Sequence, residues 1–176
     1  MFGLKTLIAL LGSTLMASAA ADWPQASARL LDLEGKEIGT VAVTQARSGM
    51  LIRLELEGLK PGPKAIHIHG NGTCNDHCDG FQASGGHVNP DGSEHGLLNA
   101  DGPDAGDLPN FMVHADGSAW VEFYTTRASL DGSFGARLMD EDGAAFVIHE
   151  NPDDHRSQPI GGAGARIACG VIEALE

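Results

Sequence analysis

The strongest constraint on this chain is an alternation of short β-type runs with glycine-containing turns, without any ten-residue helical stripe. After Pro24 the runs show a period of two or are rich in β-branched residues. Turns such as Glu34-Gly35-Lys36 and Ala115-Asp116-Gly117 are of hairpin length. We therefore predict an all-β, antiparallel fold with strands over residues 28–33, 38–45, 50–57, 65–69, 110–114, 119–126, 136–139, 145–149 and 166–172.

Two long stretches, residues 70–109 and 151–165, carry no strand signal. Loops of this length in a compact domain are usually functional or disordered. Most of the His, Cys and Gly residues with chemical interest lie in these stretches or beside them. We therefore expect the functional site to be built from the two loops.

Composition narrows the classes of function. A chain of 176 residues indicates a single domain. Its 24 acidic against 11 basic side chains give a net charge of −13, and only 5% of its residues are aromatic, so nucleic acid and anionic membrane surfaces are not expected partners. The chain has 8 His but only 3 Cys, which favours metal chemistry based on imidazole rather than thiolate.

Residues 1–21 have the pattern of an export signal. Lys5 precedes an apolar run over residues 7–16, and small residues follow over 17–21. The run is shorter than the about 20 residues that a membrane-spanning helix needs. We expect a signal peptide over 1–21, a mature domain over 22–176 in the periplasm or secreted, and no membrane association after cleavage; a buried N-terminal helix is the alternative.

Histidines form the main chemical signal. His67 and His69 stand two residues apart on a predicted strand, so both side chains project from one face while Ile66 and Ile68 face the core. A single His-x-His pair is weak support for a metal site. Further histidines follow at positions 87, 95 and 149, and clustered imidazoles with few thiols suit copper or zinc.

These histidines belong to motifs that resemble the Cu/Zn superoxide dismutase family, in an exported bacterial form. The resemblance covers roughly residue 30 to the end of the chain, and five motifs follow in the order and spacing of the family. They are His67-Ile68-His69, Gly86-His87-Val88-Asn89-Pro90, Gly106-Asp107-Leu108-Pro109, Phe146-Val147-Ile148-His149-Glu150-Asn151-Pro152-Asp153-Asp154 and the segment 161–172.

The resemblance implies a Greek-key antiparallel β-barrel, an immunoglobulin-like sandwich, with copper and zinc held outside it by the two long loops. The implied copper ligands are His67, His69, His87 and His149, and the implied zinc ligands include His87, His95 and Asp107. His87 would touch both metals. Asp153 matches a carboxylate that links a copper ligand to a zinc ligand, here His67 and His95.

One position departs from the family pattern. The residue three before the zinc aspartate is normally His, but this chain has Asp104 there. A carboxylate can bind zinc, so His87, His95, Asp104 and Asp107 could still form a four-coordinate site. The shorter, charged side chain predicts weaker zinc binding or operation with copper alone.

The resemblance implies dismutation of superoxide to dioxygen and hydrogen peroxide by one-electron cycling of copper. His87 would act as ligand and proton donor, and Arg166 matches the arginine that docks the anion beside copper. Lys64 and Arg156 are weaker candidates for attracting the anion. A non-catalytic copper-binding or copper-delivery module on the same fold is the alternative; a metal-free interaction domain would leave the spaced histidines unexplained.

The cysteines allow three single pairings. The resemblance implies a disulfide between Cys74 and Cys169. Cys78 is then left over, and it could compete for Cys169, pair between molecules, bind incoming copper with His77 or be an ordinary free thiol. His77, His114 and His155 match no ligand of the family, and we expect His114 to be a surface residue at a strand end and His155 to be a loop residue. The sequence leaves the oligomeric state open, with a homodimer as one alternative.

Overall fold

The computed structural model describes residues 23–175, so the expected signal peptide over 1–21 lies outside the described residues. All nine predicted strands are confirmed, with ends that differ by a few residues. They are β1 (Gln25–Asp32), β2 (Glu37–Gln45), β3 (Met50–Leu56), β5 (Ile66–His69), β6 (Phe111–Val113), β7 (Ala119–Thr125), β9 (Ala136–Arg137), β10 (Ala145–His149) and β11 (Arg166–Val171).

Three further strands were not predicted: β4 (Gly62–Lys64), β8 (Ala128–Ser129) and β12 (Glu173–Ala174). Each has only two or three residues, too few for a period of two to show. β4 also contains Gly62 and Pro63, which are typical of turns in a sequence. β4 and β12 therefore depend on β6 and β1, which are distant in the chain, whereas β8 pairs in parallel with β9, eight residues further on.

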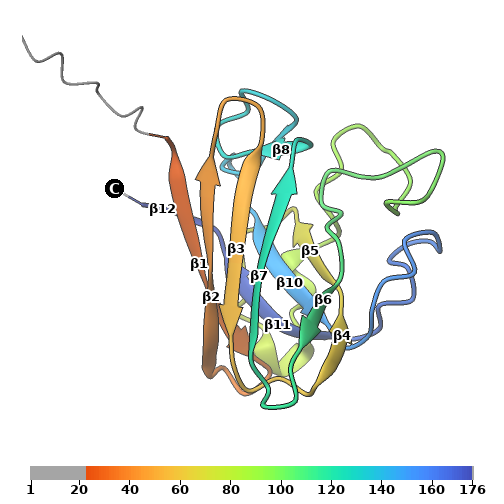
Figure 1. Cartoon of the computed structure of the whole chain (residues 1–176). Helices are drawn as coiled ribbons and strands as arrows, with labels where there is room; N and C mark the ends of the chain where they lie inside the picture. Colours follow the sequence, from red (N-terminus) through yellow and green to blue (C-terminus); the bar gives the residue numbers. More distant parts are fainter. Residues whose placement is uncertain (1–22, 176) are drawn as a thin grey trace, which may run out of the picture.

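Eight of the strands form a curled antiparallel sheet, as predicted for a Greek-key barrel (Figure 1), and β8 and β9 form a separate parallel pair. The order of the sheet is β5-β10-β11-β1-β2-β3-β7, and β12 pairs with β1. Pairing of β4 with β6 joins the two ends of this order, because β4 leads into β5 and β6 leads through a turn into β7. The neighbours β1–β11 and β3–β7 are far apart in the chain, which is characteristic of Greek-key connections.

The period of two in the sequence corresponds to a buried and an exposed face. In β3, Met50, Ile52 and Leu54 are fully buried, whereas Leu51 and Arg53 point outward. Burial of such a side chain contributes about 1.5–3 kcal/mol, so these alternating positions provide most of the driving force for the sheet. In the described part of the chain no helix has the length and apolar character needed to cross a membrane.

The two long loops emerge on one side of the barrel, as the green and blue segments of Figure 1 show. The loop over residues 70–109 folds back along β5. Backbone hydrogen bonds from Ile68 to Gly106, from Gly70 to Gly86 and from Val88 to Ile68 have N···O distances of 2.9 Å each. These bonds place His87 and Asp107 beside the two histidines of β5.

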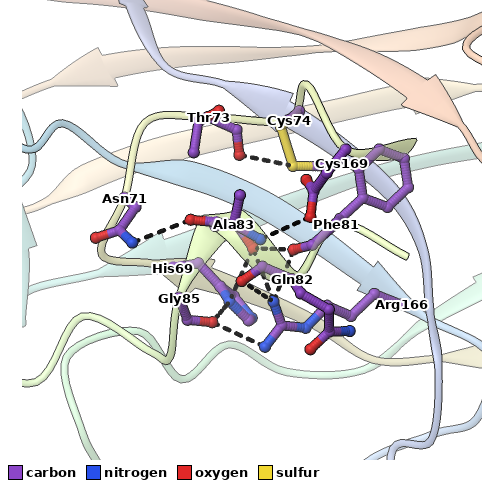
Figure 2. The surroundings of a disulfide bond; sticks show 12 residues. His69, Asn71, Thr73, Cys74, Phe81, Gln82, Ala83, Gly85, Arg166 and Cys169 are labelled. Atoms are coloured by element: carbon purple, nitrogen blue, oxygen red, sulfur yellow. Dashed lines mark hydrogen bonds between the residues drawn. A yellow bond between two sulfur atoms is a disulfide. The ribbon is translucent and has the colours of Figure 1, made fainter. Parts of the chain in front are cut away.

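A disulfide between Cys74 and Cys169 joins this loop to β11 and confirms the pairing implied by the resemblance (Figure 2). The two Cα atoms are 5.7 Å apart, and both cysteines are buried against Phe81 and Val147. Cys78 is an exposed free thiol. The disulfide therefore fixes one end of the long loop to the barrel.

Candidate metal centre

Neighbouring strands position the histidines of the barrel wall. His67 and His69 lie on β5, which pairs with β10, and His149 is the last residue of β10. Ile66 and Ile68 are fully buried in the barrel core, so the two β5 histidines face the loops as expected. A register shift after Ile148 brings His149 opposite Arg166, the first residue of β11.

Each of four histidines presents one buried ring nitrogen that has no hydrogen-bond partner. These atoms are Nδ1 of His67 and Nε2 of His69, His87 and His149. The ring centroid of His67 lies 4.2 Å from that of His87 and 5.0 Å from that of His149. An unpaired buried polar atom costs about 1–3 kcal/mol, so four neighbouring ones indicate a missing common partner. The donor set is all imidazole, which fits copper.

The remaining ring nitrogens of these side chains are held by the protein. His69 Nδ1–H donates to the Gly85 carbonyl at 2.8 Å, and His149 Nδ1–H donates to the Gly164 carbonyl at 3.1 Å. His67 Nε2–H donates to Asp153 Oδ2 at 3.0 Å. Because a neutral imidazole has one N–H, these bonds fix the tautomers and leave the unpaired nitrogens free to bind a metal.

A second group lies next to the first and shares His87. One ligand atom from each of His87, His95, Asp104 and Asp107 lies within 4.8 Å of every other. His87 Nδ1 is 2.9 Å from Asp104 Oδ2, and His95 Nδ1 is 2.6 Å from Asp107 Oδ1. The latter pair lacks the alignment of a hydrogen bond, so both atoms remain unpaired and face a common point. Two imidazoles and two carboxylates fit zinc.

Asp104 therefore lies within the zinc-type group despite its departure from the family pattern. Its Oδ1 accepts a hydrogen bond from the Gly106 amide at 2.9 Å, which leaves Oδ2 directed at His87. Asp107 is held in the same way, because its Oδ2 accepts the Gly96 amide at 2.8 Å. The loop backbone thus aims one oxygen of each carboxylate into the group.

Asp153 connects the two groups. Its carboxylate lies 3.0 Å from His67 Nε2 and 3.1 Å from His95 Nε2, the two partners expected from the resemblance. The amide of Asn110 forms reciprocal hydrogen bonds of 2.8 Å with the backbone of Asp153. A Cβ atom at Gly161, where φ is 59°, would overlap with this carboxylate, so only glycine fits there.

His155 also takes part in this network, although it matches no ligand of the family. Its backbone amide donates to Asp153 Oδ1 at 2.6 Å, and its Nδ1 lies 3.4 Å from Asp153 Oδ2. Its Nε2 accepts a hydrogen bond from the Asn110 amide at 3.2 Å. His155 lies in a loop, as expected, but its contacts with Asp153 and Asn110 were not predicted. No local sequence signal links Asn110 to His155, because only the folded loop brings them together.

Electrostatics separate the two groups. Burial, the largest effect, lowers the pKa of His67, of His69 and of His149, the last to about 3. At His87 and His95 burial also opposes protonation, but the nearby carboxylates outweigh it and raise the pKa, at His95 to about 10. His67, His69 and His149 are therefore neutral imidazoles, whereas His87 and His95 lie beside carboxylates that favour a proton, which a dication would displace.

Arg166 completes the site. A cavity of about 330 Å³ is lined by His69, His87 and His95 from the loops and strands, and by Arg166. Burial lowers the pKa of Arg166 and Asp76 opposes this effect, but a guanidinium stays charged at neutral pH. Lys64 and Arg156, the weaker candidates for attracting the anion, do not line this cavity. Lys64 is buried with Nζ 3.0 Å from the Glu150 carbonyl, and Arg156 donates to the Leu98 carbonyl.

Comparison with known proteins agrees with this geometry. The model of the copper/zinc superoxide dismutase (SODC) family matches residues 37–172. The Cu-Zn superoxide dismutase of Caulobacter vibrioides is 51% identical over 142 residues, which cover 80% of this chain and 80% of that protein. Cu-Zn superoxide dismutase 2 of Aquifex aeolicus is 42% identical over 165 residues, or 93% of this chain and 95% of that protein.

A solved structure also matches. The SOD-like protein from Bacillus subtilis is 38% identical, with a TM-score of 0.77 over 82% of this chain and 96% of that chain. The family match extends from β2 to β11 and includes both long loops. Superoxide is the substrate of this family, and copper and zinc are its cofactors. The chain therefore belongs to the copper/zinc superoxide dismutase family.

Proposed function

We propose that this superoxide dismutase holds copper with His67 Nδ1 and with Nε2 of His69, His87 and His149. The observation that carries the proposal is that these four nitrogens are buried and without a hydrogen-bond partner. One ligand atom from each of His67, His69 and His149 lies within 4.8 Å of the others, and the His87 ring lies 4.2 Å from that of His67. Three of the four side chains have their other nitrogen fixed by a protein acceptor, which prepares the lone pairs for a metal.

Zinc is assigned to His87 Nδ1, His95 Nδ1, Asp107 Oδ1 and Asp104 Oδ2. The mutual distances within 4.8 Å and the charge balance of two imidazoles against two carboxylates support this assignment. His87 then belongs to both sites. Its two nitrogens face opposite groups, Nε2 toward the copper set and Nδ1 toward Asp104.

The reaction converts two superoxide anions and two protons into dioxygen and hydrogen peroxide. Copper supplies the one-electron redox change when it is bound. Arg166 binds the small anion through its fixed charge at the wall of the cavity. His87 Nε2 holds one proton between the two half-reactions and delivers it to the reduced product, while Nδ1 keeps the ring in place on the zinc side.

Metal analysis of the purified protein together with a superoxide-decay assay tests this proposal. We expect about one copper per chain, loss of activity on chelation and recovery when copper is restored. His149→Ala removes one of the four nitrogens, so we expect copper affinity to fall by at least tenfold and activity to fall with it. His114→Ala, an exposed histidine away from the site, is the matched control. Dismutation by the metal-free protein would contradict the mechanism, and copper binding without activity would favour a delivery module.

We also propose export, with residues 1–21 as signal peptide and 22–176 as the mature domain in the periplasm or secreted. The Cys74–Cys169 disulfide supports an oxidising compartment. N-terminal sequencing of the protein recovered from the periplasm or the medium checks this expectation, and an intact Met1 there would contradict it.

The homodimer is likewise a proposal. It is supported by the large exposed apolar side chains of β6 and β7, Met112, Trp120 and Tyr124. Sedimentation analysis at several concentrations measures the oligomeric state, and a sedimentation coefficient of the monomer at every concentration would contradict the dimer.

A further inference from the structure

We propose that Ser84 is a positioning residue for the superoxide site, where its hydroxyl holds Arg166 and His69 in a fixed relation. This inference rests on the proposed function, in which Arg166 binds the anion and His69 binds copper. Ser84 itself does not act on the substrate. Its effect passes through the two side chains that its oxygen contacts.

The hydroxyl of Ser84 is fully buried among three polar partners. Ser84 ends the short 3₁₀ helix Gln82–Ser84, and its relative exposure is 0%. Its Oγ lies 2.8 Å from the Phe81 carbonyl oxygen, 3.0 Å from Arg166 Nη1 and 3.4 Å from His69 Nδ1. One buried oxygen therefore lies between the anion-binding side chain and a copper ligand.

Hydrogen-bond chemistry fixes the direction of each contact. A hydroxyl has one proton and two lone pairs. The Phe81 carbonyl can only accept, so the Ser84 proton is directed to it. The lone pairs then face Arg166 Nη1–H at 3.0 Å and, as the weaker contact, His69 Nδ1–H at 3.4 Å. The single hydroxyl thus accepts from both functional side chains.

The neighbouring Gly85 carbonyl has the same two donors. Arg166 Nη2 and His69 Nδ1 both donate to this oxygen at 2.8 Å (Figure 2). Arg166 Nη1 also donates to the Phe81 carbonyl at 2.7 Å. Backbone oxygens thus hold Nη2 of the guanidinium at Gly85 and Nη1 at Phe81, and Ser84 adds a side-chain acceptor for Nη1.

The backbone of this turn does not depend on the Ser84 hydroxyl. The Gly85 amide donates to the Gln82 carbonyl at 3.1 Å, and the Ala83 amide donates to Asp76 Oδ2 at 2.8 Å. The Cys74–Cys169 disulfide anchors the same loop to β11. Loss of the hydroxyl should therefore remove one restraint on Arg166, which keeps its bonds to Phe81 and Gly85, without unfolding the turn that surrounds it.

Ser84→Ala in the copper-loaded protein tests the inference, with azide as the probe anion. We expect azide affinity, measured by absorption titration, to fall about threefold to tenfold, because a charge-assisted contact is lost. The dismutation rate should fall with it, while copper content stays at the wild-type value. Ser129→Ala is the matched control, since Ser129 is equally buried but lies in β8. It should bind azide as the wild type does.

A double-mutant cycle separates positioning from a merely structural role. If Ser84 acts on the anion through Arg166, Ser84→Ala should cause no further loss of azide affinity in an Arg166→Ala background. Wild-type azide affinity in Ser84→Ala, or the same loss with and without Arg166, would overturn the inference. The proposed function is tested apart from it by copper binding and dismutation of the wild-type protein, which do not depend on the Ser84 result.

Discussion

At the scale of single residues, Asp104 is the position where this chain differs most from the motif of its family. Its carboxylate is held by the Gly106 amide and directed at His87, within the group that also contains His95 and Asp107. A negative charge thus occupies a place where the resemblance implies a neutral imidazole. This substitution should change the affinity for zinc, because a carboxylate ligand differs from an imidazole in charge and in softness.

Zinc titration of Asp104 variants measures this effect. Asp104→Ala removes one of four donors, and we expect zinc affinity to fall by about tenfold to a hundredfold. Asp104→His should bind zinc more tightly than the wild type, because zinc favours imidazole over a single carboxylate oxygen. Asp91→Ala, which changes an exposed aspartate outside the group, is the control. Wild-type affinity in Asp104→Ala would exclude Asp104 as a ligand.

Gly161 is a second residue at which one added atom should change metal binding. A methyl group there would meet the Asp153 carboxylate, and φ of 59° disfavours any side chain. We expect Gly161→Ala to displace Asp153 from His67 and His95 and to lower copper and zinc content of the purified protein. Gly162→Ala has an open space around the new atom and a similar positive φ, so it controls for backbone strain alone. Equal metal content in both variants would contradict the role given to Gly161.

At the scale of elements, the end of β2 is tied to the loop that follows β8. Gln45 Nε2 donates to Asp131 Oδ1 at 2.8 Å, and Gln45 Oε1 accepts the Leu130 amide at 2.6 Å. The contact with Gln45, together with the amide and hydroxyl of Ser133, lowers the pKa of Asp131 to about 2. The ionised form of Asp131 therefore helps to attach the loop to the sheet.

The lowered pKa predicts a pH dependence of stability. A depressed carboxyl pKa stabilises the fold above the unfolded value near 3.8, and the contribution is lost as pH falls through about 2. Asp131→Asn should therefore lower the free energy of unfolding at pH 7 and reduce its decline between pH 4 and pH 2. Urea unfolding of the metal-free protein at both ends of this range measures the change. A pH dependence identical to that of the wild type would refute the prediction.

At the scale of the whole molecule, the loops are attached by one covalent bond and by the metal ligands. The disulfide closes a loop between residues separated by 95 positions, for which the chain-entropy model gives about 4–5 kcal/mol as an upper figure. Metals that bind only the folded state add to this stabilisation. Loop order and barrel stability are therefore linked in one equilibrium.

Cys74→Ala with Cys169→Ala tests this link. We expect the double variant to lose about 2–4 kcal/mol of unfolding free energy. Its copper affinity should fall as well, because His87 lies on the loop that the disulfide anchors. Cys78→Ala, which removes the exposed free thiol, should change neither quantity. Unfolding and copper titrations measure both, and unchanged copper affinity in the double variant would show that the hydrogen bonds to β5 hold the loop by themselves.

The β class and most strands could be predicted from the amino-acid pattern, because the period of two in runs such as 50–57 has a direct physical cause in one buried face. The amino-acid pattern also determined the residue types of the site, since His-x-His on a strand places both rings on one side. Strands β4 and β8 could not be predicted from the sequence, because a run of two or three residues is too short to show a period of two.

Which atoms of the site meet depends on how the loops fold onto the barrel. Asn110, His155 and Gly161 are distant from one another or unremarkable in the sequence, yet all three contact Asp153. Ser84 is likewise separated from Arg166 by 82 positions before they share a hydrogen bond. Such contacts depend on how two long loops fold over the barrel, and loop conformation follows from the summed packing and hydrogen bonding of distant segments, which no local pattern encodes.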